Sequence, residues 1–157
     1  MKRKFLALLV ITVLLFSVQT ASALSAHVDT NVEYLENGDY IVTVIETVAS
    51  DESIMPLSTT TETKSKTSYY KNAAGETMWY VRVTGTFTYG DGTARCISVT
   101  PIAASYVSDW RVFDISGNKS GNKASATATG KQYVNGIVVD SHTKTVTLTC
   151  SPTGVFS

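Results

Sequence analysis

The residues best placed for chemistry are Asp140 and His142, which lie two positions apart in an alternating segment. Residues at i and i+2 of a strand share a face, so the carboxylate could orient the imidazole as a base, or both could bind a metal. A catalytic triad also needs a nucleophile, and nucleophilic serines often sit on a sharp glycine-flanked turn. The candidate serines lack that context: Ser98, Ser105, Ser141 and Ser151. We therefore expect no catalytic residue and interpret Asp140, His142 and Lys144 as an exposed polar stripe.

Carboxylates also gather in two other stretches. Glu33, Glu36, Asp39 and Glu46 surround one predicted hairpin, and Asp109 and Asp114 flank Trp110. Two carboxylates can hydrolyse glycosides, but this spacing gives that function no support. A calcium site at Asp39 or Asp91 would lack the dense Asp/Asn/Gly loop of known calcium motifs. Two cysteines with only His27 and His142 do not make a zinc pattern. We expect no metal and no cofactor.

Aromatic residues are the unusual resource of this chain, which has eight Tyr and two Trp. Exposed aromatic rings on a sheet can stack on sugars or anchor a protein partner. The alternation does not bury five of the tyrosines, namely Tyr69, Tyr70, Tyr80, Tyr106 and Tyr133. The candidate binding face consists of Tyr69, Tyr80 and Tyr133. The alternative is that these rings only bridge neighbouring strands as cross-strand pairs.

The two cysteines, Cys96 and Cys150, can form a single intramolecular pairing. An exported protein meets an oxidising compartment, where such a bond persists, so a Cys96–Cys150 disulfide is expected. The chain-entropy model gives a loop of that length about 4 kcal/mol of stabilisation. Two buried free thiols and an intermolecular bond are the alternatives.

The N-terminus has the order of a cleavable secretory signal peptide. Basic residues at 2–4 precede an uncharged apolar run at 5–18 and the small-residue triplet at 21–23. A membrane-spanning helix needs about 20 apolar residues, so this run is too short for an anchor. Cleavage after Ala23 is expected, with a site near Ala26 as the competitor. The protein is then secreted and extracellular, and no membrane contact is expected after cleavage.

Removing 23 of the 157 residues leaves 134, which fits one domain over residues 24–157. The signal takes three of the 13 basic residues and none of the 13 acidic ones, so the mature chain carries a formal charge of −3. That balance makes nucleic acid an unsuitable partner.

The elements that position these residues are strands, because the sequence is rich in Thr, Val, Tyr and Ser and lacks sustained helical spacing. Residues 31–35 and 40–48 predict a hairpin through an Asn37-Gly38 turn. The second of these strands has apolar residues on both faces, so we expect other parts of the protein to cover both faces. Residues 49–58 predict a loop. Residues 59–71 predict a solvent-facing or edge strand, with a disordered linker as the alternative for the first half.

The clearest strand is predicted at residues 77–89, with Trp79, Val81, Val83, Gly85, Phe87 and Tyr89 on its core face. Gly85 predicts a bulge or a closely crossing aromatic ring. The next strand ends near residue 102, another covers 109–115, and residues 116–123 predict a polar turn or loop.

A stripe of small residues follows, made of Ala124, Ala126, Ala128 and Gly130. It leaves room for large side chains opposite, for which the candidates are Trp79, Phe87 and Trp110. After an Asn135-Gly136 turn, residues 137–150 direct Val146, Leu148 and Cys150 inward.

About eight strands joined by short turns predict an all-β fold, an antiparallel β-sandwich that is immunoglobulin-like or a flattened barrel. Trp110 lies between the two cysteines, as in immunoglobulin domains. Leu148 stands where those domains have a tyrosine, so family membership is not expected.

Five segments together resemble a family of small secreted proteins of Gram-positive bacteria without an established activity. They are YLENGDYIV at 34–42, TSYYKNAAGETMWYVRVTGTFTYGDGTARC at 67–96, SDW at 108–110, KSGNKASATATGK at 119–131 and TKTVTLTCSPTG at 143–154. The resemblance implies a bacterial exported protein and carries no catalytic or ligand residue.

The sequence therefore predicts a monomeric, non-enzymatic secreted protein that binds an unknown protein or a cell-envelope or glycan surface. The alternatives are a secreted antimicrobial or toxin-like effector and a hydrolase that uses scattered carboxylates.

Overall fold

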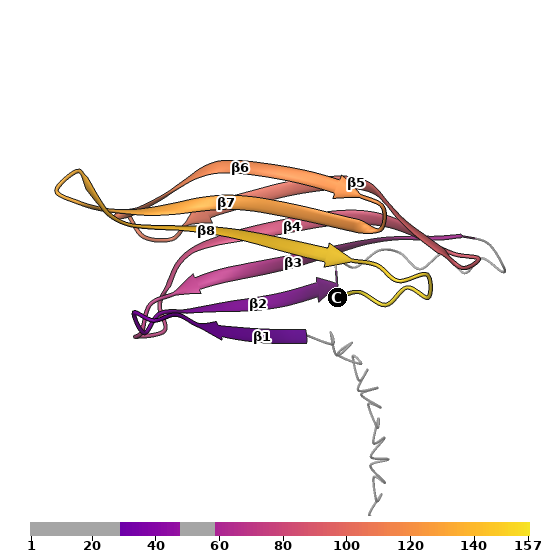
Figure 1. The fold of residues 1–157 in the computed structure, drawn as a ribbon, viewed down its shortest axis with the longest axis horizontal. Helices are drawn as coiled ribbons and strands as arrows, with labels where there is room; N and C mark the ends of the chain where they lie inside the picture. The colour runs from indigo at the N-terminus through magenta and orange to yellow at the C-terminus, as the bar shows by residue number, and fades with distance from the viewer. Residues whose placement is uncertain (1–28, 48–58) are drawn as a thin grey trace, which may run out of the picture.

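The computed structural model describes residues 29–47 and 59–157, so the predicted signal peptide and the 49–58 loop lie outside the described residues. The described residues form eight strands (Figure 1). They are β1 (Asp29–Tyr34), β2 (Tyr40–Thr47), β3 (Thr60–Lys71), β4 (Thr77–Gly90), β5 (Thr93–Ser105), β6 (Trp110–Ser120), β7 (Lys123–Val134) and β8 (Ile137–Thr149). None of the described residues belongs to a helix long and apolar enough to cross a membrane.

The strands form two antiparallel sheets, which confirms the predicted all-β sandwich. One sheet has the order β1-β2-β3-β4-β5 and the other β6-β7-β8. Within each sheet, strands that follow one another in the chain pair, so both sheets are simple meanders. Immunoglobulin domains instead have Greek-key connections, so this chain has the sandwich architecture without that strand order.

Two of the predicted tight turns have the expected backbone. Gly38 has a φ of 86° in the β1–β2 turn, and Asn135 and Gly136 have φ values of 52° and 80° in the β7–β8 turn. Positive φ is favourable for Gly and tolerated by Asn, which is why Asn-Gly pairs join these hairpins.

The core lies between β4 and the small-residue stripe of β7, as predicted. Trp79, Val81, Val83 and Phe87 are buried on one face of β4, and Ala124, Ala126 and Ala128 are buried opposite. The Trp79 indole ring occupies the space where a Cβ on Gly130 would lie. A Cβ on Gly85 would lie 2.5 Å from the Phe87 ring and 2.9 Å from Ala124 Cβ, which confirms the predicted close aromatic contact. Small residues here make room for large rings.

The predictions for β2 and β3 need correction. β3 is not an edge strand, because β2 and β4 pair on its two sides. Its hydroxyl residues Ser65, Thr67 and Ser68 are buried. β2 is covered on one face only, since Ile41 is buried while Val42 and Val44 are partly exposed on the other. Cross-strand hydroxyl bonds, which a pattern of apolar residues does not reveal, explain how β3 can be central.

The polar segment predicted as a turn or loop at 116–123 is also mostly strand. β6 continues to Ser120, and only Gly121 and Asn122 form the turn before β7. Ser116–Ser120 pair with Lys123–Thr127 across the hairpin. Main-chain pairing with β7 thus outweighs the weak strand preference of Gly, Asn and Ser.

The expected Cys96–Cys150 disulfide is not formed. Both residues are buried free cysteines. The β6–β7 turn lies between their backbones, because Cys96 N–H donates to Gly121 C=O at 2.8 Å and Cys150 N–H donates to Asn122 C=O at 3.0 Å. The prediction used the even count of cysteines, and a count contains no information on this intervening turn.

Each thiol bonds instead to a main-chain oxygen nearby. Cys96 Sγ donates to Ser98 C=O at 3.1 Å, and Cys150 Sγ donates to Ser151 C=O at 3.4 Å. Burial raises the pKa of both thiols. The alternative of two buried thiols is therefore the one observed.

Candidate binding face of the five-stranded sheet

The Asp140–His142 pair forms as the alternation predicted, but it packs against the core. Asp140 Oδ2 and His142 Nε2 are 3.0 Å apart. The His142 ring lies against Tyr70, with centroids 4.9 Å apart, and stacks on Trp110 at 6.5 Å. Lys144 forms an ion pair with Glu33 at 2.6 Å. Asp140, His142 and Lys144 are therefore half-buried and paired with other side chains, and do not form the exposed stripe that was predicted.

The candidate metal ligands do not converge. Across residues 29–47 and 59–157, no group of three or more His, Cys, Asp or Glu side chains could hold a metal ion. A concavity of about 360 Å³ includes three carboxylates, Asp39, Glu76 and Asp109. Each of these carboxylates accepts a hydrogen bond from a neighbour: Tyr70, Asn72 and Gln132 respectively. These three carboxylates therefore stabilise the fold through hydrogen bonds.

Tyr70 was grouped with the outward tyrosines, and this prediction is wrong. Its ring is buried between the sheets and stacks on Trp79 at 5.9 Å. Its hydroxyl donates to Asp39 Oδ2 at 2.6 Å. Burial first, and then the hydrogen bond to Asp39, raise the pKa of Tyr70 above its ordinary value. Adjacent residues point to opposite faces, so burial of Tyr70 directs Tyr69 outward.

Two of the three predicted binding residues do come together. Tyr69 on β3 lies directly opposite Tyr80 on β4, with ring centroids 6.1 Å apart. Tyr106, after β5, adds a third ring 5.6 Å from Tyr80. Tyr133 does not join them, because it lies on β7 in the other sheet, where Arg111 covers its ring at 5.0 Å.

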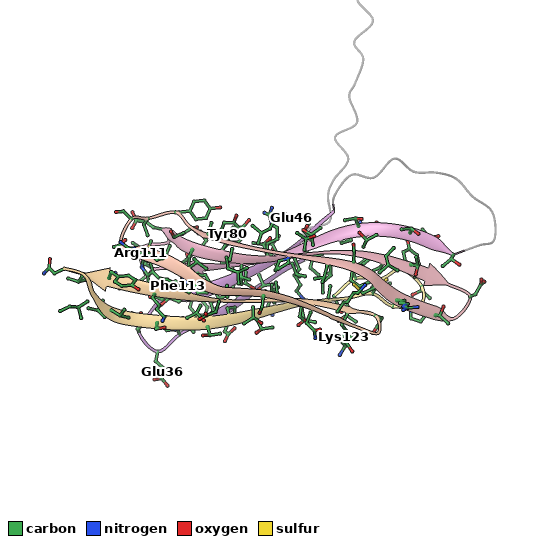
Figure 2. All side chains as sticks on the ribbon, turned by 90° about the horizontal axis from the view of Figure 1, so that it is seen from above. Glu36, Glu46, Tyr80, Arg111, Phe113 and Lys123 are labelled. Carbon is green, nitrogen blue, oxygen red and sulfur yellow. The ribbon has the colours of Figure 1, made fainter. Side chains whose placement is uncertain are left out.

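Arg82 forms the centre of this cluster. Its guanidinium lies 5.8 Å from the Tyr80 centroid, and Nη2 pairs with Glu46 at 3.4 Å. Its Nε–H donates to Thr67 Oγ1 at 2.8 Å, and Thr67 is fully buried although it faces away from the core. Figure 2 labels Tyr80 and Glu46 on this sheet, with Arg111 and Phe113 on the other. The guanidinium is thus held in one place by three contacts.

Aliphatic side chains extend the cluster across all five strands. The cross-strand register places Val32, Val42, Tyr69, Tyr80 and Ala104 in one row. The next row includes Val44, Thr67, Arg82 and Ile102, and Tyr34 packs on Tyr40 with centroids 5.8 Å apart. We call this surface the aromatic face; it consists of Val32, Tyr34, Tyr40, Val42, Val44, Tyr69, Tyr80, Arg82, Ile102 and Tyr106.

Several members of the aromatic face are well exposed. The exposed fractions are 78% for Tyr34, 61% for Tyr106, 44% for Val32 and 43% for Ile102. Desolvation first, and then the neighbouring Tyr69 and Tyr80, raise the pKa of Tyr106. Large exposed patches on a single domain are commonly contact surfaces.

The rest of this sheet surface is different in chemistry. Thr63 bonds to Thr86 at 3.0 Å and Ser65 to Thr84 at 2.7 Å. Hydroxyls that bond to one another in pairs have less capacity left for a ligand. The aromatic face is therefore a bounded patch at one end of the sheet.

The sequence pattern missed part of this face. The second strand of the first hairpin, which includes Val42 and Val44, was expected to be covered on both sides, and the predicted binding face did not include Tyr34, Tyr40 or Arg82. The available signal was the alternation itself, which places Tyr40, Val42 and Val44 on one face of their strand.

Comparisons of this chain with protein-family models, with curated proteins and with solved structures found no match. The surface itself is therefore the basis for assigning a function.

Proposed function

We propose that this chain is an exported, non-enzymatic binding protein that contacts another protein through the aromatic face. The observation that carries the proposal is the cluster of Tyr69, Tyr80 and Tyr106 around a fixed Arg82. Tyr and Arg are enriched among the residues that dominate binding energy at protein interfaces. Aliphatic neighbours and a polar surround match the usual arrangement of an apolar centre and a wetter rim.

The ring geometry favours a protein partner over a flat glycan. Tyr69 and Tyr80 are inclined by 40° to one another, and Tyr80 and Tyr106 by 41°. Tilted rings give an uneven surface into which side chains can insert, whereas sugar rings in an extended chain stack best on faces that share a plane. The proposed partner is therefore a protein, and the test below distinguishes it from a glycan.

The Arg82–Glu46 pair adds specificity. The two side chains are about a third exposed, at 33% and 39%, and lie where the aromatic face meets the hydroxyl rows, since Glu46 is opposite Ser65 and Arg82 is opposite Thr67. A partner that covers them must offer matching polar groups, since an interfacial charge without a partner is costly. This requirement selects among partners that could all cover the tyrosines.

Export supports the same proposal. The basic, apolar and small-residue order of residues 1–23 and the resemblance to small secreted proteins of Gram-positive bacteria both favour a released protein. A released domain that binds through a preformed surface needs no catalytic group, and the Asp140–His142 pair is occupied in packing against Tyr70 and Trp110.

The test measures binding of the labelled protein, without residues 1–23, to cells of the organism from which the gene comes. The triple variant Tyr69→Thr, Tyr80→Thr, Tyr106→Thr should lose about tenfold or more in binding, as removal of interface hot spots does. Its matched control, Phe113→Thr with Tyr133→Thr on the other sheet, should bind like the unaltered protein. Treating the cells with protease should abolish binding.

Two results would contradict the proposal. Binding that survives protease treatment would identify a glycan or another non-protein surface. Equal binding by the triple variant and the control would remove the aromatic face as the contact surface.

A further inference from the structure

The two sheets differ in size, and the difference leaves a cleft beside β8. β1 and β2 extend the larger sheet beyond the β8 edge of the smaller one (Figure 1). The cleft has a volume of about 380 Å³. One wall is formed by inward-facing side chains of β1, β2 and β3, including Glu33, Thr43, Lys66 and Ser68. β8 forms the opposite wall.

The edge of β8, and not one of its faces, lines this cleft. Four consecutive residues, Lys144, Thr145, Val146 and Thr147, border it. Successive side chains on a strand point to opposite faces, so four neighbours can share one cleft only where the cleft runs along the strand's edge. β8 is the last strand in its sheet. Its outward main-chain groups therefore face the cleft.

The C-terminal residues show which main-chain groups these are. Thr149 N–H donates to Ser157 C=O at 2.9 Å, and Ser157 N–H donates to Thr149 C=O at 3.0 Å. Alternate residues of an antiparallel strand direct N–H and C=O to the same side. Thr147 and Thr145 therefore present two donors and two acceptors to the cleft, and among the described strands none pairs with β8 on this side.

We propose that this edge accepts an extended segment of a partner polypeptide, which adds to the smaller sheet as a fourth, antiparallel strand. The chain itself shows the direction, because Phe156 pairs antiparallel with Cys150 at one end of the edge. A strand continuing from the position of Ser157 would run past Thr147 and Thr145. Main-chain hydrogen bonds supply affinity in such strand addition, and alternate side chains supply specificity.

The cleft wall indicates the chemistry of that segment. Thr43 and Ser68 are hydrogen-bonded to each other at 2.8 Å. Glu33, Lys66 and Lys144 also border it, and Lys144 pairs with Glu33 at 2.6 Å. Alternate residues of the added strand that face this wall are therefore polar.

Lys144 also argues against a second copy of this chain as the occupant. It points inward from an edge strand and is tied to Glu33 across the cleft at 2.6 Å. Inward-facing charges on edge strands are a common protection against self-association. An identical β8 edge would bring a second lysine into the same cleft.

The strand-acceptor site does not depend on the aromatic face. The cleft wall uses the inner surface of β1–β3, and the aromatic face uses their outer surface. The aromatic-face triple variant should therefore keep strand acceptance, so the two proposals can fail separately.

The test appends Ser-Thr-Glu-Thr-Ser-Thr directly after Ser157 and follows amide hydrogen exchange by NMR. Exchange at Thr145 and Thr147 should slow by about tenfold or more, since a paired edge amide is protected by local stability. The control extension has proline at its second and fourth added positions, which removes the N–H groups that would face β8. It should leave both exchange rates as they are in the unextended chain.

A second arm adds the acetylated hexapeptide in solution at millimolar concentration. It should slow hydrogen exchange at the same two amides. N-methylation of the peptide nitrogens that face β8 should abolish this effect, whereas N-methylation of the nitrogens that face away should not.

Unchanged exchange in the extended chain overturns the proposal, because a short tether supplies an effective concentration in the millimolar range. Protection that persists with the proline extension overturns it as well, since that protection does not come from main-chain pairing. Failure of the free peptide removes the claim that a separate polypeptide occupies the site.

Discussion

Tyr69 and Tyr80 face each other on the outside of the five-stranded sheet, 6.1 Å apart, while the residues beside them, Tyr70 and Trp79, stack inside the core. Four aromatic residues at the same level of two paired strands thus divide into an outer pair and an inner pair. The inner pair stabilises the fold, and the outer pair belongs to the aromatic face.

This division predicts unequal costs of substitution. Tyr80→Thr should lower the free energy of unfolding by about 1 kcal/mol or less, because a cross-strand pair contributes that much. Tyr70→Ala should cost about 3 to 5 kcal/mol, as truncation of a buried aromatic residue does. Urea unfolding measures both values. Similar losses for the two variants would mean that the outer pair is part of the core.

Gly130 on β7 is predicted to be intolerant of even one methyl group. A Cβ there would overlap the Trp79 indole ring, so Gly130→Ala should destabilise the fold by about 1 to 3 kcal/mol through overpacking. Ser125→Ala on the outer side of the same strand is the control and should cost less than about 1 kcal/mol, because it removes only a cross-strand hydroxyl bond to Thr147. A neutral Gly130→Ala would show that Trp79 can move away from β7.

The cysteines should be found as thiols in the purified, folded protein. Burial of Cys96 and Cys150 and the raised pKa of both thiols predict no reaction with iodoacetamide at pH 8 until denaturant is added. Two alkylated residues in the unfolded chain, measured by mass spectrometry, would agree with this account. A mass two hydrogens lower with no alkylation in denaturant would indicate the disulfide instead.

Alkaline pH should weaken the fold through Tyr89. Burial first, and then its hydrogen bond to Glu62, raise the pKa of Tyr89 from 10.0 to about 12. Between these values the unfolded chain releases the proton while the folded chain keeps it, so the free energy of unfolding falls as pH rises. The contribution is complete below pH 10 and lost above about pH 12.

The check is urea unfolding at several pH values across this range. Tyr89→Phe has no proton to release, so its stability should fall less steeply than that of the unaltered protein. Equal slopes would show that the Tyr89 hydroxyl titrates normally.

His142 should contribute to stability through the packing of its ring and should not act as a base. His142→Asn should lower the free energy of unfolding by about 1 kcal/mol, since ring contacts with Tyr70 and Trp110 are lost, while His142→Phe should retain most of it. Both variants should bind cells normally. Loss of binding in His142→Phe would give the imidazole a functional role.

The sequence predicted those elements in which alternation and turn residues agree. β4 has apolar residues at every second position and glycine-rich turns at both ends, so its core face was identified correctly. The packing of Trp79 on the small-residue stripe also followed, because a stripe of small residues needs large neighbours.

The errors occurred where stability comes from contacts between distant residues. β3 is rich in Thr, Ser and Lys and resembles an edge strand, yet partners on both sides bury its hydroxyls. The Cys96–Cys150 separation depends on the position of the Gly121-Asn122 turn, which local pattern does not reveal. Tyr133 was grouped with Tyr69 and Tyr80 because alternation gives the side of a strand but not the sheet to which the strand belongs.

The most direct test of the aromatic face is photo-crosslinking with a benzophenone amino acid placed at Ile102. Thr127, on the outer surface of the other sheet, is the control position. On cells of the organism from which the gene comes, we expect one discrete protein adduct from position 102 and none from position 127. The same adduct from both positions, or none from position 102 while the labelled protein remains bound, would contradict it.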